Sequence, residues 1–209
     1  MAKENDKKHK GMVLVISAPS GTGKDATIEK VLKKSDNIVM SISATTRSPR
    51  ALEKNGKSYY FLSVFEFKER IKNKEMLEYT KYCGDYYGTL YEPLIENINK
   101  GLDVILKIEV DGARQIRNIF KDSVHIFVLP PSLKELSKRL ADRGTETQEA
   151  INERLGTAIK EMKFAKNYDY AVINKNLDAC ADEIYKIIQV ERLRISRLNY
   201  KEEIVREVF

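Results

Sequence analysis

A glycine-rich stretch between an apolar run and a helical pattern constrains this chain more than any other feature. It reads Ser-Ala-Pro-Ser-Gly-Thr-Gly-Lys-Asp over residues 17–25. The apolar run 12–16 before it predicts a strand, and residues 26–33 after it predict a helix. A glycine-rich turn in this context aims backbone N–H groups and the positive end of a helix at a phosphate. We therefore expect a phosphate-binding loop here.

Two positions of this loop depart from the common pattern G-x-x-x-x-G-K-[ST]. Ala18 stands where the first glycine is usual, which restricts the turn. Asp25 stands where a hydroxyl normally ligates Mg²⁺. Lys24 is in place to contact the terminal phosphates of a nucleotide. The alternative, a turn that binds nothing, is disfavoured by the flanking strand and helix.

The composition is that of a single globular domain. The chain has 209 residues, of which 42% are hydrophobic and 33% are charged. No apolar run approaches a membrane span and the N-terminus does not read as a signal peptide, so we expect a cytoplasmic protein without a membrane partner. The cysteines lack metal-ligand spacing, and no protein-built metal site is expected.

The net charge of +6 has two readings, a nucleic-acid surface or arginines that converge on small phosphorylated ligands. Basic residues interleaved with aromatic ones are absent, so the second reading is favoured and no nucleic acid is expected. Arg47 and Arg50 lie in one proline-containing loop, where they could converge on one anion; taken alone, the segment is more typical of a solvated loop with incidental charge. Arg139 and Arg143 are four apart on one helix side, and with Arg154 they could form an arginine-bearing flap.

Apolar strands alternate with helical patterns along most of the chain. This alternation predicts an α/β fold with a parallel, doubly wound sheet and a ligand at the carboxyl ends of its strands. The predicted core strands are 12–16, 37–43, 103–110, 124–129 and 170–173. Short strands at 58–62, 76–79 and 84–88, with capping boxes at Ser63 and Thr89, indicate a mostly β insertion. This insertion is the best candidate for a substrate lobe.

Four motifs together resemble the guanylate kinase family in order and spacing. They are Ser-Ala-Pro-Ser-Gly-Thr-Gly-Lys at 17–24, Ser-Ala-Thr-Thr-Arg-Ser-Pro-Arg at 43–50, Gly-Asp-Tyr-Tyr-Gly at 84–88 and Arg-Gly-Thr-Glu-Thr at 143–147. The resemblance runs from about residue 11 to residue 197. It implies phosphorylation of GMP, and of dGMP, by ATP with nucleotide-carried Mg²⁺, in a monomer or homodimer.

The resemblance also implies domain limits and residue roles. The implied limits are a disordered tail 1–10, a core (11–41, 94–132 and 156–197), a GMP-binding lobe 42–93, a helical lid 133–155 and a charged extension 198–209. The implied ATP-binding residues are Ala18, Pro19, Ser20, Gly21, Thr22, Gly23, Lys24, Asp25 and Asn174. The implied GMP-binding residues are Ser43, Arg47, Arg50, Tyr59, Glu78, Tyr87, Thr89 and Glu109. The implied catalytic residues are Lys24, Arg47, Arg139, Arg143 and Arg154.

Two residues depart from the family pattern where the metal is expected. Asp25 replaces a small or hydroxyl residue, and Lys107 replaces an acid on the strand that approaches the phosphates. Three explanations stay open: the two residues pair with each other, Lys107 contacts a phosphate, or Asp25 binds the cation or its water shell. Because of these two departures, an alternative function stays open: a catalytically weakened module that binds GMP or a protein.

Overall fold

The structure of the protein is a computed structural model, and it describes residues 10–82, 84–142 and 147–197. The predicted extension 198–209, all but the last residue of the predicted tail, and Arg143 lie outside the described residues. Over the described ranges, no helix is long and apolar enough to cross a membrane.

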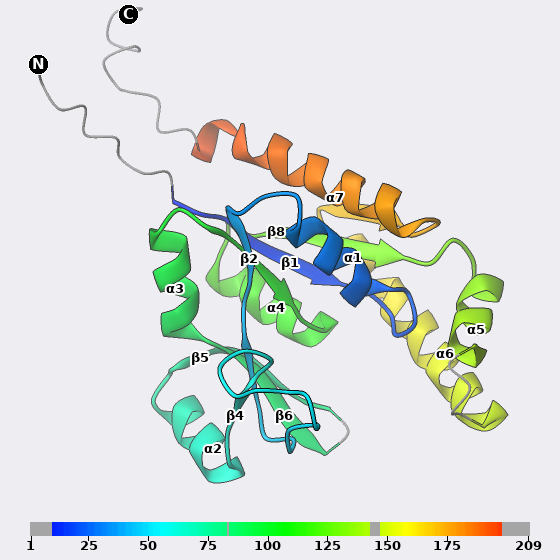
Figure 1. The fold of residues 1–209 in the computed structure, drawn as a ribbon, viewed down its shortest axis with the longest axis horizontal. Helices are drawn as coiled ribbons and strands as arrows, with labels where there is room; N and C mark the ends of the chain where they lie inside the picture. The colour runs from blue at the N-terminus through cyan, green and yellow to red at the C-terminus, as the bar shows by residue number, and fades with distance from the viewer. Residues whose placement is uncertain (1–9, 83, 143–146, 198–209) are drawn as a thin grey trace, which may run out of the picture.

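A five-stranded, wholly parallel sheet forms the core, in the order β2-β7-β1-β8-β9 (Figure 1). Its strands are β1 (Val13–Ser17), β2 (Ile38–Met40), β7 (Asp103–Lys107), β8 (Val124–Leu129) and β9 (Tyr170–Ile173). The order doubles back at β1, which has strands from later in the chain on both sides. The predicted doubly wound α/β fold is therefore confirmed.

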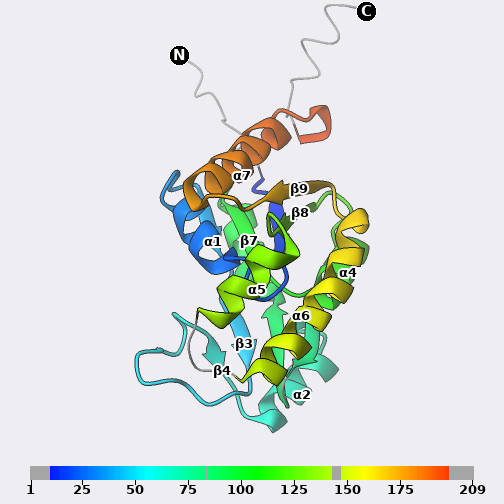
Figure 2. The same ribbon diagram turned by 90° about the vertical axis from the view of Figure 1, so that its right-hand side faces the viewer.

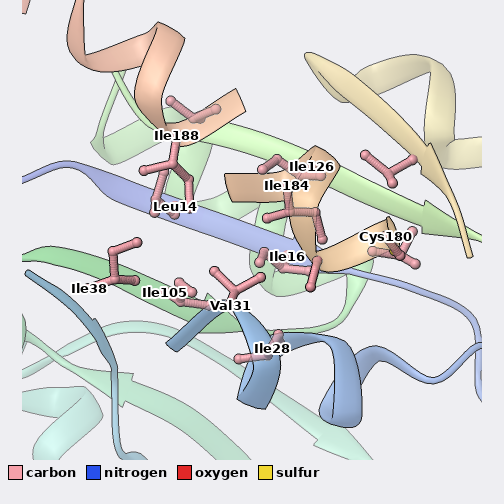
Figure 3. Close-up of a cluster of buried hydrophobic side chains, with 14 of the residues drawn as sticks. Leu14, Ile16, Ile28, Val31, Ile38, Ile105, Ile126, Cys180, Ile184 and Ile188 are labelled. Carbon is pink, nitrogen blue, oxygen red and sulfur yellow. The ribbon is translucent and has the colours of Figure 1, made fainter. Parts of the chain in front are cut away.

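Helices cover both faces of this sheet because β1 alternates two sets of buried apolar side chains. Leu14 and Ile16 pack beneath α1 (Lys24–Leu32) and α7 (Leu177–Arg192), as Figure 3 shows. Val13 and Val15 pack on the other face against residues of α3 (Tyr91–Asn99) and α4 (Val110–Ile119). The strand ends are thereby held rigidly, and the loop after β1 emerges from a fully buried strand.

A second, four-stranded sheet lies beyond one end of the core sheet (Figure 1). It has the order β4-β3-β6-β5, with strands β3 (Ser43–Thr45), β4 (Tyr60–Phe61), β5 (Met76–Tyr82) and β6 (Asp85–Leu90). Helix α2 (Val64–Lys72) packs on it through the buried Phe67, and Ser63 forms the predicted capping box. Gln115 of α4 ties this sheet to the core, because its side-chain amide donates to the Tyr79 carbonyl at 3.0 Å.

Two further helices, α5 (Leu133–Ala141) and α6 (Gln148–Met162), stand beside the carboxyl end of the core sheet (Figure 2). Leu136 and Leu140 of α5 pack against Ile151 and Ala158 of α6. The α5 helix begins at the predicted cap, Ser132, whose hydroxyl accepts from the Glu135 N–H. The α6 helix continues through the predicted lid boundary at residue 155. Short 3₁₀ helices, η1 (Lys163–Asn167) and η2 (Ile195–Arg197), complete the described elements.

Three local predictions are wrong. Residues 37–43 are not one strand: β2 ends at Met40, and β3 begins at Ser43 in the other sheet. The strand predicted over 103–110 ends at Lys107, because Glu109 becomes the extended cap of α4. Thr89 does not cap α3. It lies in β6, and its hydroxyl donates instead to the Glu78 carboxylate.

Candidate active site

The predicted phosphate loop connects β1 to α1 and has the backbone shape that its glycines allow. Gly21 has φ +85° and Gly23 has φ +91°, values that side-chain-bearing residues rarely adopt. A Cβ at Gly23 would also lie 2.8 Å from the Asn174 side-chain amide, and one at Gly21 would lie 2.7 Å from Leu140. Both positions therefore need glycine for conformation and for space.

Side chains from three distant elements contact this loop. Asn174, which is 1% exposed, donates to the Thr22 carbonyl at 2.8 Å. Arg139 of α5 donates to the same carbonyl at 3.4 Å. Arg154 of α6 reaches the Ser20 hydroxyl at 2.5 Å. Arg139 and Arg154, two of the three predicted flap arginines, thus lie at the loop. The resemblance implied that Asn174 binds ATP, and in the structure its side-chain amide donates to the loop backbone.

Two ion pairs join the start of α1 to the end of β7. Lys24 contacts the Glu109 carboxylate at 3.1 Å. Lys107 contacts Asp25 at 3.1 Å. The pairing of Asp25 with Lys107, one of the three explanations left open by the sequence, is confirmed.

Glu78 of β5 is a buried carboxylate, 2% exposed, at the junction of the two sheets. The Thr89 hydroxyl donates to it at 2.7 Å. Gly112 of α4 abuts it, because a Cβ there would lie 2.4 Å from the carboxylate oxygen Oε2. Burial, reinforced by the nearby Glu109 charge, raises the pKa of Glu78 to about 7. A ligand that donates hydrogen bonds to this carboxylate would therefore stabilise its ionised form.

Arg47 follows β3 of the small sheet, and its guanidinium makes a fork-like contact with Glu53. Its two terminal nitrogens lie 3.0 and 2.9 Å from the two Glu53 oxygens. This contact is the main reason that the pKa of Arg47 is raised. The guanidinium also sits 5.4 Å from the ring centre of Tyr59. Arg50 is exposed, and its backbone N–H donates to the same Glu53 carboxylate at 2.8 Å.

A cleft of about 520 Å³ runs between the phosphate loop and the small sheet. The predicted site residues that line it are Ala18, Pro19, Ser20, Gly21, Gly23, Lys24, Asp25, Ser43, Tyr59, Glu78, Tyr87 and Glu109. The described site residues outside its lining are Thr22, Arg47, Arg50, Thr89, Arg139, Arg154 and Asn174. The cleft thus joins the loop lysine and the buried Glu78 in one cavity.

The sequence reasoning missed Glu161, which also lines the cleft. Its Oε2 atom is buried and has no hydrogen-bond partner within the described residues. Burial, with the nearby Glu109 charge, raises the pKa of Glu161 to about 7. The available signal was its spacing: Glu161 follows Arg154 by two helical turns, so both face the loop side of α6.

A parallel sheet with a glycine-rich loop after β1, a lysine at the start of α1 and a cleft at the strand ends defines a nucleotide-binding protein of the phosphate-loop class. Residues 10–191 match the sequence model of the family described as guanylate kinase, and the chain belongs to this family.

Individual members of the family are similar to this chain over nearly its whole length. It is 46% identical to the guanylate kinase of Clostridium tetani, over 90% of each chain. It is 44% identical to that of Clostridioides difficile, over 94% of this chain and 95% of the relative. A crystal structure of the guanylate kinase from Anaplasma phagocytophilum superposes with a TM-score of 0.78 at 34% identity, covering 95% of each chain. The resemblance that the four motifs indicated is confirmed.

Proposed function

We propose that the cleft binds ATP at the phosphate loop and GMP at the small sheet, and that the terminal phosphoryl group passes directly between them. As a member of the guanylate kinase family, the protein is a phosphotransferase that phosphorylates GMP with ATP. The observation that carries the assignment is that Lys24 and the buried Glu78 line one cavity. Because phosphoryl transfer needs mainly positioning and charge neutralisation, the charged and polar side chains of this cleft are sufficient without a protein nucleophile.

On the donor side, Lys24 and the loop N–H groups hold the ATP phosphates. Lys24 exchanges the Glu109 carboxylate for phosphate oxygens when ATP binds, since both are anionic acceptors. Arg139 and Arg154, already at the loop, stabilise negative charge on the transferring group, and Arg143 shares this role. The lid formed by α5 and α6 then excludes water, which would otherwise accept the phosphoryl group.

On the acceptor side, Glu78 accepts hydrogen bonds from guanine N1–H and the N2 amino group. Adenine lacks that pair of adjacent donors, so a carboxylate selects guanine. Thr89 orients Glu78 through its 2.7 Å hydrogen bond, and Ser43, paired with Thr89 in the sheet register, lies beside the base. Because Glu78 reads only the base, it favours GMP and dGMP alike.

The GMP phosphate belongs at the aromatic and basic end of the small sheet. Tyr59 and Tyr87 line the cleft with their rings 6.3 Å apart, and the Arg47 side chain lies against Tyr59. The Arg47 guanidinium and the Arg50 backbone N–H both donate to the Glu53 carboxylate, an anion that a phosphate can replace. GMP displaces this carboxylate when Arg47 turns to the phosphate.

Mg²⁺ fits this cleft as an ion carried by the nucleotide. Among the described residues, no three His, Cys, Asp or Glu side chains converge as a metal site. Asp25 and Glu109 supply carboxylates beside the loop, and Mg²⁺ commonly uses one or two carboxylates together with phosphates and water. When bound, the metal neutralises charge on the phosphate oxygens.

A coupled ADP-release assay across GMP, dGMP, AMP, UMP and CMP tests the function. We expect turnover with GMP and dGMP only, and loss of this preference in Glu78→Gln. No turnover with any acceptor, together with thermal stabilisation by GMP, would instead favour the weakened binding module. Preference for AMP or UMP would refute the role of Glu78. Glu29→Gln, which removes the same charge from an exposed site on α1, is the matched control.

A further inference from the structure

The two ion pairs at the loop cross between the same two segments. Consecutive residues of α1, Lys24 and Asp25, contact Glu109 and Lys107 near the end of β7. Each segment therefore contributes one cation and one anion. The nucleotide-binding role of Lys24 accounts for the first pair, whereas the proposed mechanism gives Lys107 of the second pair no role.

Lys107 is placed to act on phosphates. It ends a strand whose other residues are buried, and it pairs in register with Ile16, one residue before the end of β1. Its side chain is 30% exposed and lines the cleft, whereas its partner Asp25 is 71% exposed. Lys107 is thus the partly buried member of the pair. Asp25 is mostly exposed, so it can exchange the lysine for water at little cost in free energy.

We propose that Lys107 is a second phosphate-binding lysine for the donor nucleotide, and that Asp25 is its reversible partner before the nucleotide binds. This proposal rests on the proposed function. When the phosphates of ATP take Lys24 from Glu109, two carboxylates and a polyphosphate share the mouth of the cleft. Lys107 then turns from Asp25 to a phosphate oxygen and balances part of that charge, as a charge-assisted contact.

The opposite view is that the Asp25–Lys107 pair only joins α1 to β7. The two views differ in the sign of their mutational effects. If Lys107 binds phosphate, Lys107→Gln weakens nucleotide binding, while Asp25→Asn strengthens it by releasing the lysine and removing a repelling charge. If the pair is only structural, either substitution changes the free energy of unfolding and leaves nucleotide affinity unchanged.

The test is titration calorimetry with ADP in EDTA, so that the lysine's contribution is measured without metal. We expect Lys107→Gln to weaken ADP binding on the order of tenfold, the size of one partly exposed charge-assisted contact. We expect Asp25→Asn to tighten it severalfold. Lys30→Gln is the matched control, because Lys30 lies on α1 in an exposed ion pair with Asp178 away from the cleft.

Equal ADP affinity in Lys107→Gln, Asp25→Asn and Lys30→Gln would overturn the proposal, as would weaker binding in Asp25→Asn. If Lys107→Gln fails to fold, Asp25→Asn alone decides between the two views. Wild-type turnover of GMP is measured in parallel. If the wild type turns over GMP but both Lys107→Gln and Asp25→Asn bind ADP normally, the role of Lys107 is refuted and the kinase function stands. If the wild type shows no turnover, the kinase function itself is refuted.

Discussion

Replacing Glu78 with glutamine should stabilise the fold while it removes guanine recognition. The carboxylate is buried, and its pKa is raised from an ordinary 4.5 to about 7. The folded state therefore prefers the protonated form. The stability associated with this preference is fully present below pH 4.5 and is lost as the pH rises through 7. A pKa raised by this amount corresponds to about 3 kcal/mol of unfolding free energy.

Urea denaturation of the wild type and Glu78→Gln at pH 5, 6, 7 and 8 measures this effect. The variant should gain little stability at pH 5 and about 3 kcal/mol relative to the wild type at pH 8. Other titrating groups, including Glu161, are present in both proteins and so cancel in the difference. The Thr89 hydroxyl can still donate to the amide oxygen of glutamine, so the packing is kept.

The same variant should bind GMP weakly, because a glutamine amide group presents a donor to the guanine donors. Glu29→Gln, on an exposed position of α1, should show neither effect. A stability difference between Glu78→Gln and the wild type that stays constant from pH 5 to pH 8 would refute the reasoning. It would mean that the buried carboxylate carries the same charge in the folded and unfolded states.

Three further substitutions test separate parts of the structure. Gly112→Ala places a Cβ 2.4 Å from the Glu78 carboxylate, so GMP binding by calorimetry should weaken while ADP binding is unchanged; weakening of both would contradict this. Phe67→Ala should cost about 3–5 kcal/mol in denaturant unfolding by opening a cavity beneath the small sheet; a cost below 1 kcal/mol would contradict full burial. Asn174→Ala removes the donor to the Thr22 carbonyl, so KM for ATP should rise more than KM for GMP in steady-state assays; equal increases would contradict a local effect on the loop.

Most of the core sheet was predictable because β1, β7 and β8 are largely buried, mostly apolar runs between turn signals. The strand 124–129 was predicted with its observed limits, and so was 170–173. The errors fall at the ends of strands, where the chain enters the other sheet or a helix. Between Met40 and Ser43 nothing in the apolar pattern marks the change of sheet, since both strands have extended backbone and each contains buried side chains. Tertiary pairing decided that boundary.

The site residues divide in the same way. A local motif fixes the loop, so Gly21, Gly23 and Lys24 could be found from sequence. The contact of Asn174 with the loop joins residues far apart in the chain, and no spacing rule reports it. Glu161 belongs to no motif, and its spacing from Arg154 indicates only a shared face of α6; its place in the cleft follows from how α6 packs. The Asp25–Lys107 pair was predictable only because two unusual residues carried opposite charges.

Three cations in or beside the cleft have acidic partners within the protein. Each of three cations contacts a carboxylate, in the pairs Lys24–Glu109, Lys107–Asp25 and Arg47–Glu53. A half-buried cation without a partner is costly, so these carboxylates stabilise the cations. Under the proposed function, phosphates replace these carboxylates when the nucleotides bind. Glu78 differs, because within the described part of the chain it has a hydroxyl donor but no cation. Under the proposed function, the N–H groups of guanine satisfy this carboxylate, so the phosphate contacts supply affinity and Glu78 selects the base.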